Sequence, residues 1–115
     1  MESEAGKVLE LVVFKLRGEA SSEQLLGTVD AVSAWIGEQP GFVSRELAYD
    51  AAVDRWVDVV WWETLDHAHA AAERAATSES CAPMFALIDM ESTLMLHGVP
   101  AIRPVLPATA VGVSP

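Results

Sequence analysis

The sequence has little of several features that would assign a function directly. One cysteine, Cys81, occurs among 115 residues, so no disulfide can form within the chain. This composition favours a reducing compartment and predicts a cytoplasmic location. No apolar run approaches the roughly 18 residues that a transmembrane helix needs, and the polar start "MESEAGK" argues against a signal peptide. We therefore expect neither a disulfide-stabilised fold nor a membrane-spanning one.

Positive charge is also scarce. Seven lysine and arginine residues stand against seventeen aspartate and glutamate residues, which gives a formal net charge of −10. A surface of this sign repels phosphate backbones and anionic lipid head groups. Nucleic acid and membranes are therefore not expected as partners.

Motifs that hold phosphates, nucleotides or metal ions are missing from the sequence. No glycine-rich phosphate loop, nucleophile elbow or dinucleotide fingerprint occurs. His67 and His69 are of the type that binds metals, but side chains two positions apart on a helix point to nearly opposite sides. We expect both histidines on a solvated helix surface. Cys81 has no basic neighbour in sequence to activate its thiol. The sequence predicts no metal site and no cofactor.

Apolar and aromatic residues, by contrast, are abundant. Hydrophobic residues make up 51% of the chain, which is enough for one folded core in a chain of this length. Four tryptophans must be buried in a core, an interface or a ligand pocket. We expect a single domain over residues 7–99, after an N-terminal tail over residues 1–6. Residues 100–115 carry four prolines and are predicted to form an extended C-terminal arm.

Hydrophobic periodicity predicts four strands, because apolar residues recur with a period of two in four segments. These segments are residues 7–17, 41–49, 55–63 and 91–99. Helical spacing follows the first and third of them, so the element order is βαββαβ. With right-handed crossovers, this order predicts the α+β ferredoxin-like plan, a four-stranded antiparallel sheet with two helices on one face.

Capping residues mark where the two helices begin. Ser21 or Ser22 is the predicted N-cap of the first helix, with Gln24 placed to complete a capping box. Pro40 and Gly41 end this helix. Thr64 is expected to cap the second helix, which runs through residues 65–80 until Pro83 interrupts it. One further helical turn is expected over residues 84–88.

Asp58 lies inside the third strand between Trp56 and Trp62, an unusual place for a carboxylate. The period of two places these three residues on one face of the sheet and a wholly apolar set on the other. We expect the wholly apolar set to pack against the helices, together with the matching residues of the first strand. That set is Leu9, Leu11, Val13, Val57, Val59 and Trp61. Asp58 then belongs to the opposite, open face.

The same alternation gathers ionisable and aromatic side chains from all four strands on the face of Asp58. The predicted site residues are Glu10, Phe14, Arg45, Trp56, Asp58, Trp62 and His97, with Val12 and Val60 between them. Apolar walls with a few polar groups are typical of a ligand cavity. Among these residues His97 is the main acid/base candidate, because imidazole titrates near neutral pH. Alternatively, Arg45 and Asp58 form a buried structural pair, and the tryptophans pack in a dimer.

Four segments carry a resemblance to a known family: "ELVVFKLR", "QPGFVSREL", "RWVDVVWWETLDHAHAAAE" and "PMFALIDMESTLMLH". In this order the chain resembles the antibiotic-biosynthesis-monooxygenase-like proteins of the dimeric α/β-barrel superfamily. The resemblance implies a homodimer in which two sheets pack face to face, which would cover the face that one chain leaves open. It also implies a cavity between the sheet and its own helices or those of the partner. The C-terminal arm could wrap the neighbouring subunit.

The sequence departs from the better-known members at positions that carry chemistry. Many members have a glutamate where this chain has Val60, and a histidine in the second helix where this chain has an alanine near Ala71. The Asn, Trp and His set of the haem-degrading members is not recognisable. The resemblance therefore implies the fold more strongly than the reaction.

Two functions fit these observations. The first is a cofactor-independent monooxygenase or related tailoring enzyme for a phenolic or quinol-like substrate. His97 would be the base, with Asp58 or Glu10 orienting it or serving instead, and Arg45 would stabilise the developing negative charge. Phe14, Trp56 and Trp62 would bind the aromatic rings. The second is a non-catalytic dimer that binds a small apolar ligand. Haem binding is a third, weaker alternative.

Overall fold

The computed structural model describes residues 7–108, which form one four-stranded antiparallel sheet and helices that cover it. The strands are β1 (Val8–Phe14), β2 (Phe42–Asp50), β3 (Arg55–Trp62) and β4 (Leu94–Gly98), and their spatial order is β2-β3-β1-β4. This order confirms the α+β ferredoxin-like plan. The predicted tail over residues 1–6 and residues 109–115 of the predicted arm lie outside the described residues.

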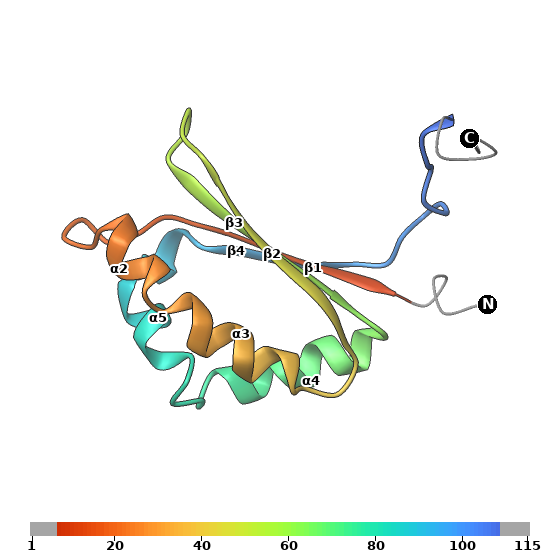
Figure 1. Ribbon diagram of the computed structural model, residues 1–115, viewed down its shortest axis with the longest axis horizontal. Helices are drawn as coiled ribbons and strands as arrows, with labels where there is room; N and C mark the ends of the chain where they lie inside the picture. Colours follow the sequence, from red (N-terminus) through yellow and green to blue (C-terminus); the bar gives the residue numbers. More distant parts are fainter. Residues whose placement is uncertain (1–6, 109–115) are drawn as a thin grey trace, which may run out of the picture.

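The helices all lie on one side of the sheet, as Figure 1 shows. They are α2 (Ser22–Leu26), α3 (Val29–Gly37), α4 (Leu65–Ala75) and α5 (Ala82–Leu87), followed by the short 3-10 helix η1 (Met90–Ser92). Within residues 7–108 the opposite face of the sheet carries no helix. One layer of helices on one sheet is the arrangement that the element order predicts.

The first predicted helix is divided into α2 and α3. Its start agrees with the prediction, because Ser21 and Gln24 form a reciprocal capping box with hydrogen bonds of 2.8 and 3.1 Å. The division falls at Gly27 and Thr28. Glycine is a weak helix former, and the Thr28 hydroxyl donates a 2.7 Å hydrogen bond to the Leu25 carbonyl. This local bond competes with regular helix geometry.

The second predicted helix ends earlier than expected, at Ala75. Its N-cap is Thr64, whose hydroxyl accepts a hydrogen bond from the His67 N–H at 3.1 Å, as predicted. Beyond the helix, the Ser78 hydroxyl accepts hydrogen bonds from the backbone N–H groups of Ser80 and Cys81 and favours a turn instead. The predicted further turn forms α5.

Gly41 directly precedes β2 and has a left-handed backbone, at φ 84°. A Cβ atom at this position would lie 2.3 Å from Cγ of His67, far closer than side chains approach one another. Both the backbone conformation and the close approach to His67 therefore require glycine here. This turn fixes where the α3 end meets the start of α4.

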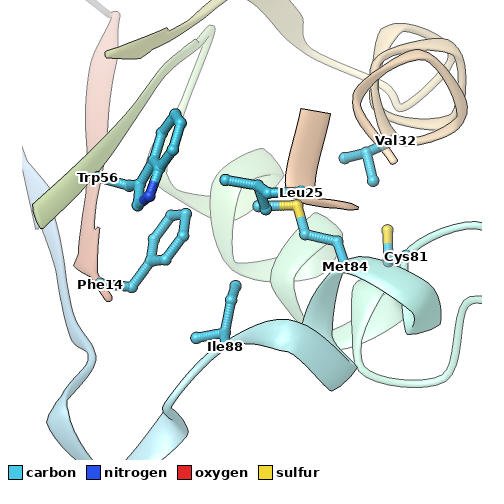
Figure 2. Close-up of a cluster of buried hydrophobic side chains, with 7 residues drawn as sticks. All are labelled: Phe14, Leu25, Val32, Trp56, Cys81, Met84 and Ile88. Atoms are coloured by element: carbon cyan, nitrogen blue, oxygen red, sulfur yellow. The ribbon is translucent and has the colours of Figure 1, made fainter. Parts of the chain in front are cut away.

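The structure reverses the predicted sides of the sheet. The face of Asp58 packs against the helices, and Phe14, Trp56, Val60 and Trp62 on that face are buried. Figure 2 shows Phe14 and Trp56 from the sheet beside Leu25, Met84 and Ile88 from the helical layer. The prediction that the wholly apolar set packs against the helices is wrong. The mixed face can be buried because its charged groups pair with one another, which lowers their desolvation cost.

The wholly apolar set lies on the open face instead. Its six members, Leu9, Leu11, Val13, Val57, Val59 and Trp61, are partly buried by their neighbours. Leu94 and Leu96 of β4 lie on the same face and are about half exposed. Cross-strand pairs such as Leu11 with Val59 and Leu96 continue this surface over three strands. A contiguous, partly exposed apolar surface of this kind is typical of interaction sites.

Candidate functional site

A cavity of about 260 Å³ lies between the helix-covered face of the sheet and helices α3, α4 and α5. Its volume is slightly below the roughly 300–1,000 Å³ of pockets for drug-sized ligands, so it suits a small molecule. The wall is mostly apolar and aromatic, and small side chains of α4 leave the space open: Ala71, Ala72 and Ala75. Three charged side chains enter this wall, namely Glu10, Arg45 and Asp58.

Five of the seven predicted site residues line the cavity: Glu10, Phe14, Arg45, Asp58 and Trp62. The other two are placed differently. Trp56 lies in the core, where its ring stacks with Phe14 and contacts Tyr49, with centroid distances of 6.5 and 4.7 Å. His97 lies beside Glu10 but outside the cavity wall. A ligand in this cavity would therefore meet Glu10, and not His97, as its nearest acid/base group.

Glu10 occupies the middle of β1, directly opposite His97 of β4 and Val60 of β3. As a whole residue, Glu10 is buried, with 8% of its surface exposed. The indole N–H of Trp62 donates a 2.9 Å hydrogen bond to Oε1, and Nε2 of His97 lies 3.5 Å from the same oxygen. No described residue donates a hydrogen bond to Oε2. Oε2 is therefore the oxygen that remains available to a ligand.

The surroundings of Glu10 favour its protonated form. Burial raises the pKa of the Glu10 carboxyl above its ordinary value, and the negative charge of Asp58 acts in the same direction. The hydrogen bond from Trp62 and the nearby imidazole of His97 oppose this rise. A carboxyl whose pKa lies closer to neutrality is better suited to exchange protons with a bound molecule.

Arg45 and Asp58 form a two-pronged ion pair across β2 and β3. Nε and Nη2 of Arg45 donate to the two carboxylate oxygens of Asp58 at 2.9 and 2.7 Å, and Nη1 donates to Ser33 at 3.1 Å. Their side chains are 6% and 11% exposed. Because Asp58 and Ser33 occupy all three nitrogens of Arg45, this geometry favours the structural alternative for the pair.

His69 is a residue that sequence reasoning placed on the solvated surface of α4, where it does lie. Its ring also packs against that of His97 at 85°, with centroids 4.8 Å apart. His67, by contrast, contacts the Thr64 hydroxyl at 2.9 Å. In the sequence, the sign that His69 could contact the sheet is its position next to Ala68, which is buried on the sheet-facing side of α4. This sign can be interpreted only once β4 is known to lie opposite.

Val60 and Ala71 both line the cavity. Val60 is one place at which the sequence departs from the pattern implied by the resemblance, and Ala71 lies near the other. The cavity thus has apolar groups at these places, and its acid comes from Glu10 on a different strand. No three His, Cys, Asp or Glu side chains within residues 7–108 lie close enough together to bind a metal ion. None of the helices in this range has the length and apolar character to span a membrane.

The sequence matches no protein-family model and no curated protein. Several solved structures share the fold. SnoaB, a cofactor-independent oxygenase from Streptomyces nogalater, superposes with a TM-score of 0.61 at 21% identity over 90% of this chain and 99% of that one. The ActVA-Orf6 monooxygenase of Streptomyces coelicolor, solved in complex with nanaomycin D, gives 0.64 at 20% identity over 90% and 95%.

A third structure, a candidate antibiotic biosynthesis monooxygenase from Bordetella bronchiseptica, gives a TM-score of 0.69 at 18% identity. The superposition covers 88% of this chain and 99% of that one. At this level of identity the likeness establishes architecture, and chemistry has to be argued from the site itself. The chain therefore has the fold of the antibiotic-biosynthesis-monooxygenase-like proteins of the dimeric α/β-barrel superfamily.

Proposed function

We propose that this protein is a small cofactor-independent monooxygenase that oxidises a phenolic or quinol-like molecule within the cavity. The observation that carries the proposal is a buried carboxyl, Glu10, in the wall of an otherwise mostly apolar cavity. The fold shared with SnoaB and the ActVA-Orf6 monooxygenase adds support. Such a site can bind an aromatic molecule and remove a proton from its hydroxyl group. The resulting anion can react with O₂ without any other catalytic group from the protein.

The proposed reaction begins when Oε2 of Glu10 accepts the proton of a substrate hydroxyl. The resulting electron-rich anion reacts with O₂ directly, and the apolar wall keeps bulk water away from the intermediate. For a quinol, one oxygen atom enters the ring to give a hydroxyquinone and the other leaves as water. The substrate supplies all four electrons, so no external reductant is needed.

The roles differ in part from those predicted from sequence. Glu10 takes the place of His97 as the base, because Glu10 lines the cavity and His97 does not. Phe14 and Trp62 are the aromatic residues available to a bound ring, whereas Trp56 lies in the core. Arg45 acts mainly by holding Asp58 and β2 in place.

We further propose that two copies pack through their open sheet faces. The apolar surface around Leu11, Trp61 and Leu96 has the continuity that such an interface needs. A groove between Trp61 and the described part of the arm, residues 100–105, continues this surface.

The buried Cys81, with no second cysteine in the chain, agrees with the predicted cytoplasmic location, which stays a prediction.

Oxygen consumption tests the proposed reaction. A panel of phenols, hydroquinones and dihydroxynaphthalenes would be incubated with the protein, with Glu10→Gln and with Glu73→Gln, a control on the exposed surface of α4. We expect Glu10→Gln to lose a factor of about 10²–10⁴ in rate, the usual contribution of a general base, and Glu73→Gln to match the wild type. If no member of the panel consumes oxygen faster with protein than without it, the monooxygenase proposal fails.

A non-catalytic ligand-binding protein is the second candidate. The apolar Val60 and Ala71 in the cavity wall favour it, because the resemblance implies a glutamate in the place of Val60 and a histidine near that of Ala71. Under this alternative a small aromatic molecule binds without turnover, and Glu10→Gln leaves its affinity unchanged. Titration with haemin in the same series tests haem binding, the third alternative. Bound haem should give a discrete absorbance band.

A further inference from the structure

We propose that Glu10, His97 and His69 form a proton route between the cavity and solvent, in which the two histidines act through Glu10. The role of this route in turnover rests on the proposed function. The route itself rests on three side chains joined by two contacts that need no substrate. The side chains are a carboxyl in the cavity wall, a largely buried imidazole next to it, and an exposed imidazole against the second.

The first step joins Glu10 to His97. Their backbones are direct partners in the antiparallel pair of β1 and β4, so both side chains lie on the helix-covered face. Nε2 of His97 is 3.5 Å from Oε1 of Glu10. This nitrogen is buried and has no hydrogen-bond partner among the described residues. Unpartnered buried polar atoms are rare because they cost free energy, and a small shift would bring this nitrogen into hydrogen-bond range of Glu10.

The second step joins His97 to the surface. The His69 ring meets the His97 ring edge to face, with centroids 4.8 Å apart, and His69 is exposed on α4. The His97 side chain itself is only 15% exposed. In the proposed route a proton on His97 leaves at this point through water, and the exposed His69 imidazole takes part in its release.

The proton balance is complete. Glu10 takes one proton from the substrate through Oε2 and becomes a neutral carboxylic acid. Rotation of the neutral carboxyl about its Cγ–Cδ bond then turns the protonated oxygen toward His97, and the proton passes to Nε2. The other ring nitrogen of His97 releases a proton to water beside His69, which leaves His97 as its other neutral tautomer. Proton exchange with water restores the first tautomer, so Glu10 and His97 return to their starting states and the active site has exported one proton. The route returns Glu10 to its ionised form without using water in the cavity.

The charged neighbours of this route are few. The titratable or charged groups around Glu10 are Asp58 and Arg45 on the sheet, His97 on β4, and Cys81 at the start of α5. Asp58 and Arg45 neutralise each other as a close pair. His97 meets Glu10 on one side and His69 on the other. His97 is therefore the group through which Glu10 would exchange protons with the protein surface.

The Trp62 indole provides a direct readout, because its N–H donates to Oε1 of Glu10. Its NMR signal should follow the protonation of Glu10. Four tryptophans give four indole signals, and Trp62→Phe identifies the relevant one. The midpoint of its pH titration reports the pKa of Glu10, and relaxation dispersion at that midpoint reports how fast the proton enters and leaves. Spectral dispersion shows whether each variant remains folded.

The proposal predicts different effects for three variants. His97→Gln should move the Glu10 midpoint upward, because it removes a charge that favours the ionised carboxylate. His69→Gln should leave that midpoint nearly unchanged but slow proton exchange by about 10²-fold or more, the lower end of what a positioned proton-transfer group contributes. Added imidazole should restore the rate. His67→Gln, on the same helix but in contact with Thr64, should change neither quantity.

Two results would overturn the route: an unchanged midpoint in His97→Gln, or an unchanged exchange rate in His69→Gln. Should His69→Gln be poorly folded, His69→Ala with and without imidazole tests the same step. These readouts need no substrate. Intact proton coupling with no oxygen consumption would therefore refute the proposed function alone, and turnover without coupling would refute the route alone.

Discussion

Neutralising Asp58 while leaving Arg45 in place should destabilise the domain severely. Asp58→Asn keeps the shape of the side chain but removes the charge that balances the guanidinium, which is 6% exposed. Removing one partner of a buried pair costs about 3–5 kcal/mol. The asparagine oxygen can still accept one of the two hydrogen bonds, so we expect the lower end, about 3 kcal/mol.

Urea denaturation followed by tryptophan fluorescence measures this loss, at fixed protein concentration because a dimer's stability depends on it. The matched control is Glu19→Gln, because Glu19 pairs with Arg17 at 3.8 Å on the surface, where the side chains are 56% and 79% exposed. Exposed pairs contribute about 0–1 kcal/mol, so this control should barely change the midpoint.

Replacing both partners separates the ion pair from simple packing. Arg45→Met combined with Asp58→Leu leaves no unpaired charge, so the double variant should be more stable than Asp58→Asn and within about 1 kcal/mol of the wild type. The reasoning is refuted if Asp58→Asn costs less than about 1 kcal/mol, or if the double variant is as unstable as the single one.

Further predictions concern pH, backbone strain and assembly. Because burial raises the pKa of Glu10, the folded state binds a proton more tightly than the unfolded state, and the free energy of unfolding should fall as pH rises from about 4.5 through the raised value. Glu10→Gln should flatten this fall in a pH series of urea denaturations; an equal slope in both proteins would contradict it. Gly41→Ala should cost at least about 1–2 kcal/mol through its left-handed backbone, and adding His67→Ala should recover only the part due to the clash; full recovery in thermal unfolding would disprove the strain. Leu96→Glu on the open face should shift a dimer to monomer in sedimentation, whereas Glu23→Gln on α2 should not; a wild-type monomer would refute the proposed assembly.

Most of the fold could be predicted from local signals. The capping box at Ser21 and the cap at Thr64 are short-range features, and both appear where the sequence placed them. The break at Thr28 was missed because the helical apolar spacing continues through it, while the hydroxyl bond that favours the break has no counterpart in that pattern.

The gathering of polar groups on one face followed from the period of two, but the side on which that face lies did not. A wholly apolar row such as Leu9, Leu11 and Val13 is equally consistent with a helix-covered core and with an interface between sheets. Polarity alone favoured the wrong choice, because the pairing that makes Arg45 and Asp58 tolerable in the interior depends on strand register.

The acid/base assignment shifted for the same reason. Histidine chemistry singled out His97, but only the register of β1 and β4 places Glu10 between His97 and the cavity. The contact of His69 with His97 joins α4 to β4, two elements whose relative placement no local pattern encodes.

The central claim is that a small aromatic molecule binds in the cavity beside Glu10 and Trp62. It is tested most directly by anaerobic NMR titration of the protein with a dihydroxynaphthalene, using Ala71→Leu to fill the cavity and Ala34→Leu as an exposed control on α3. We predict saturable movement of the Trp62 indole signal in the wild type and in Ala34→Leu, and none in Ala71→Leu. Binding that survives Ala71→Leu with the same affinity, or that leaves the Trp62 signal in place, would contradict the claim.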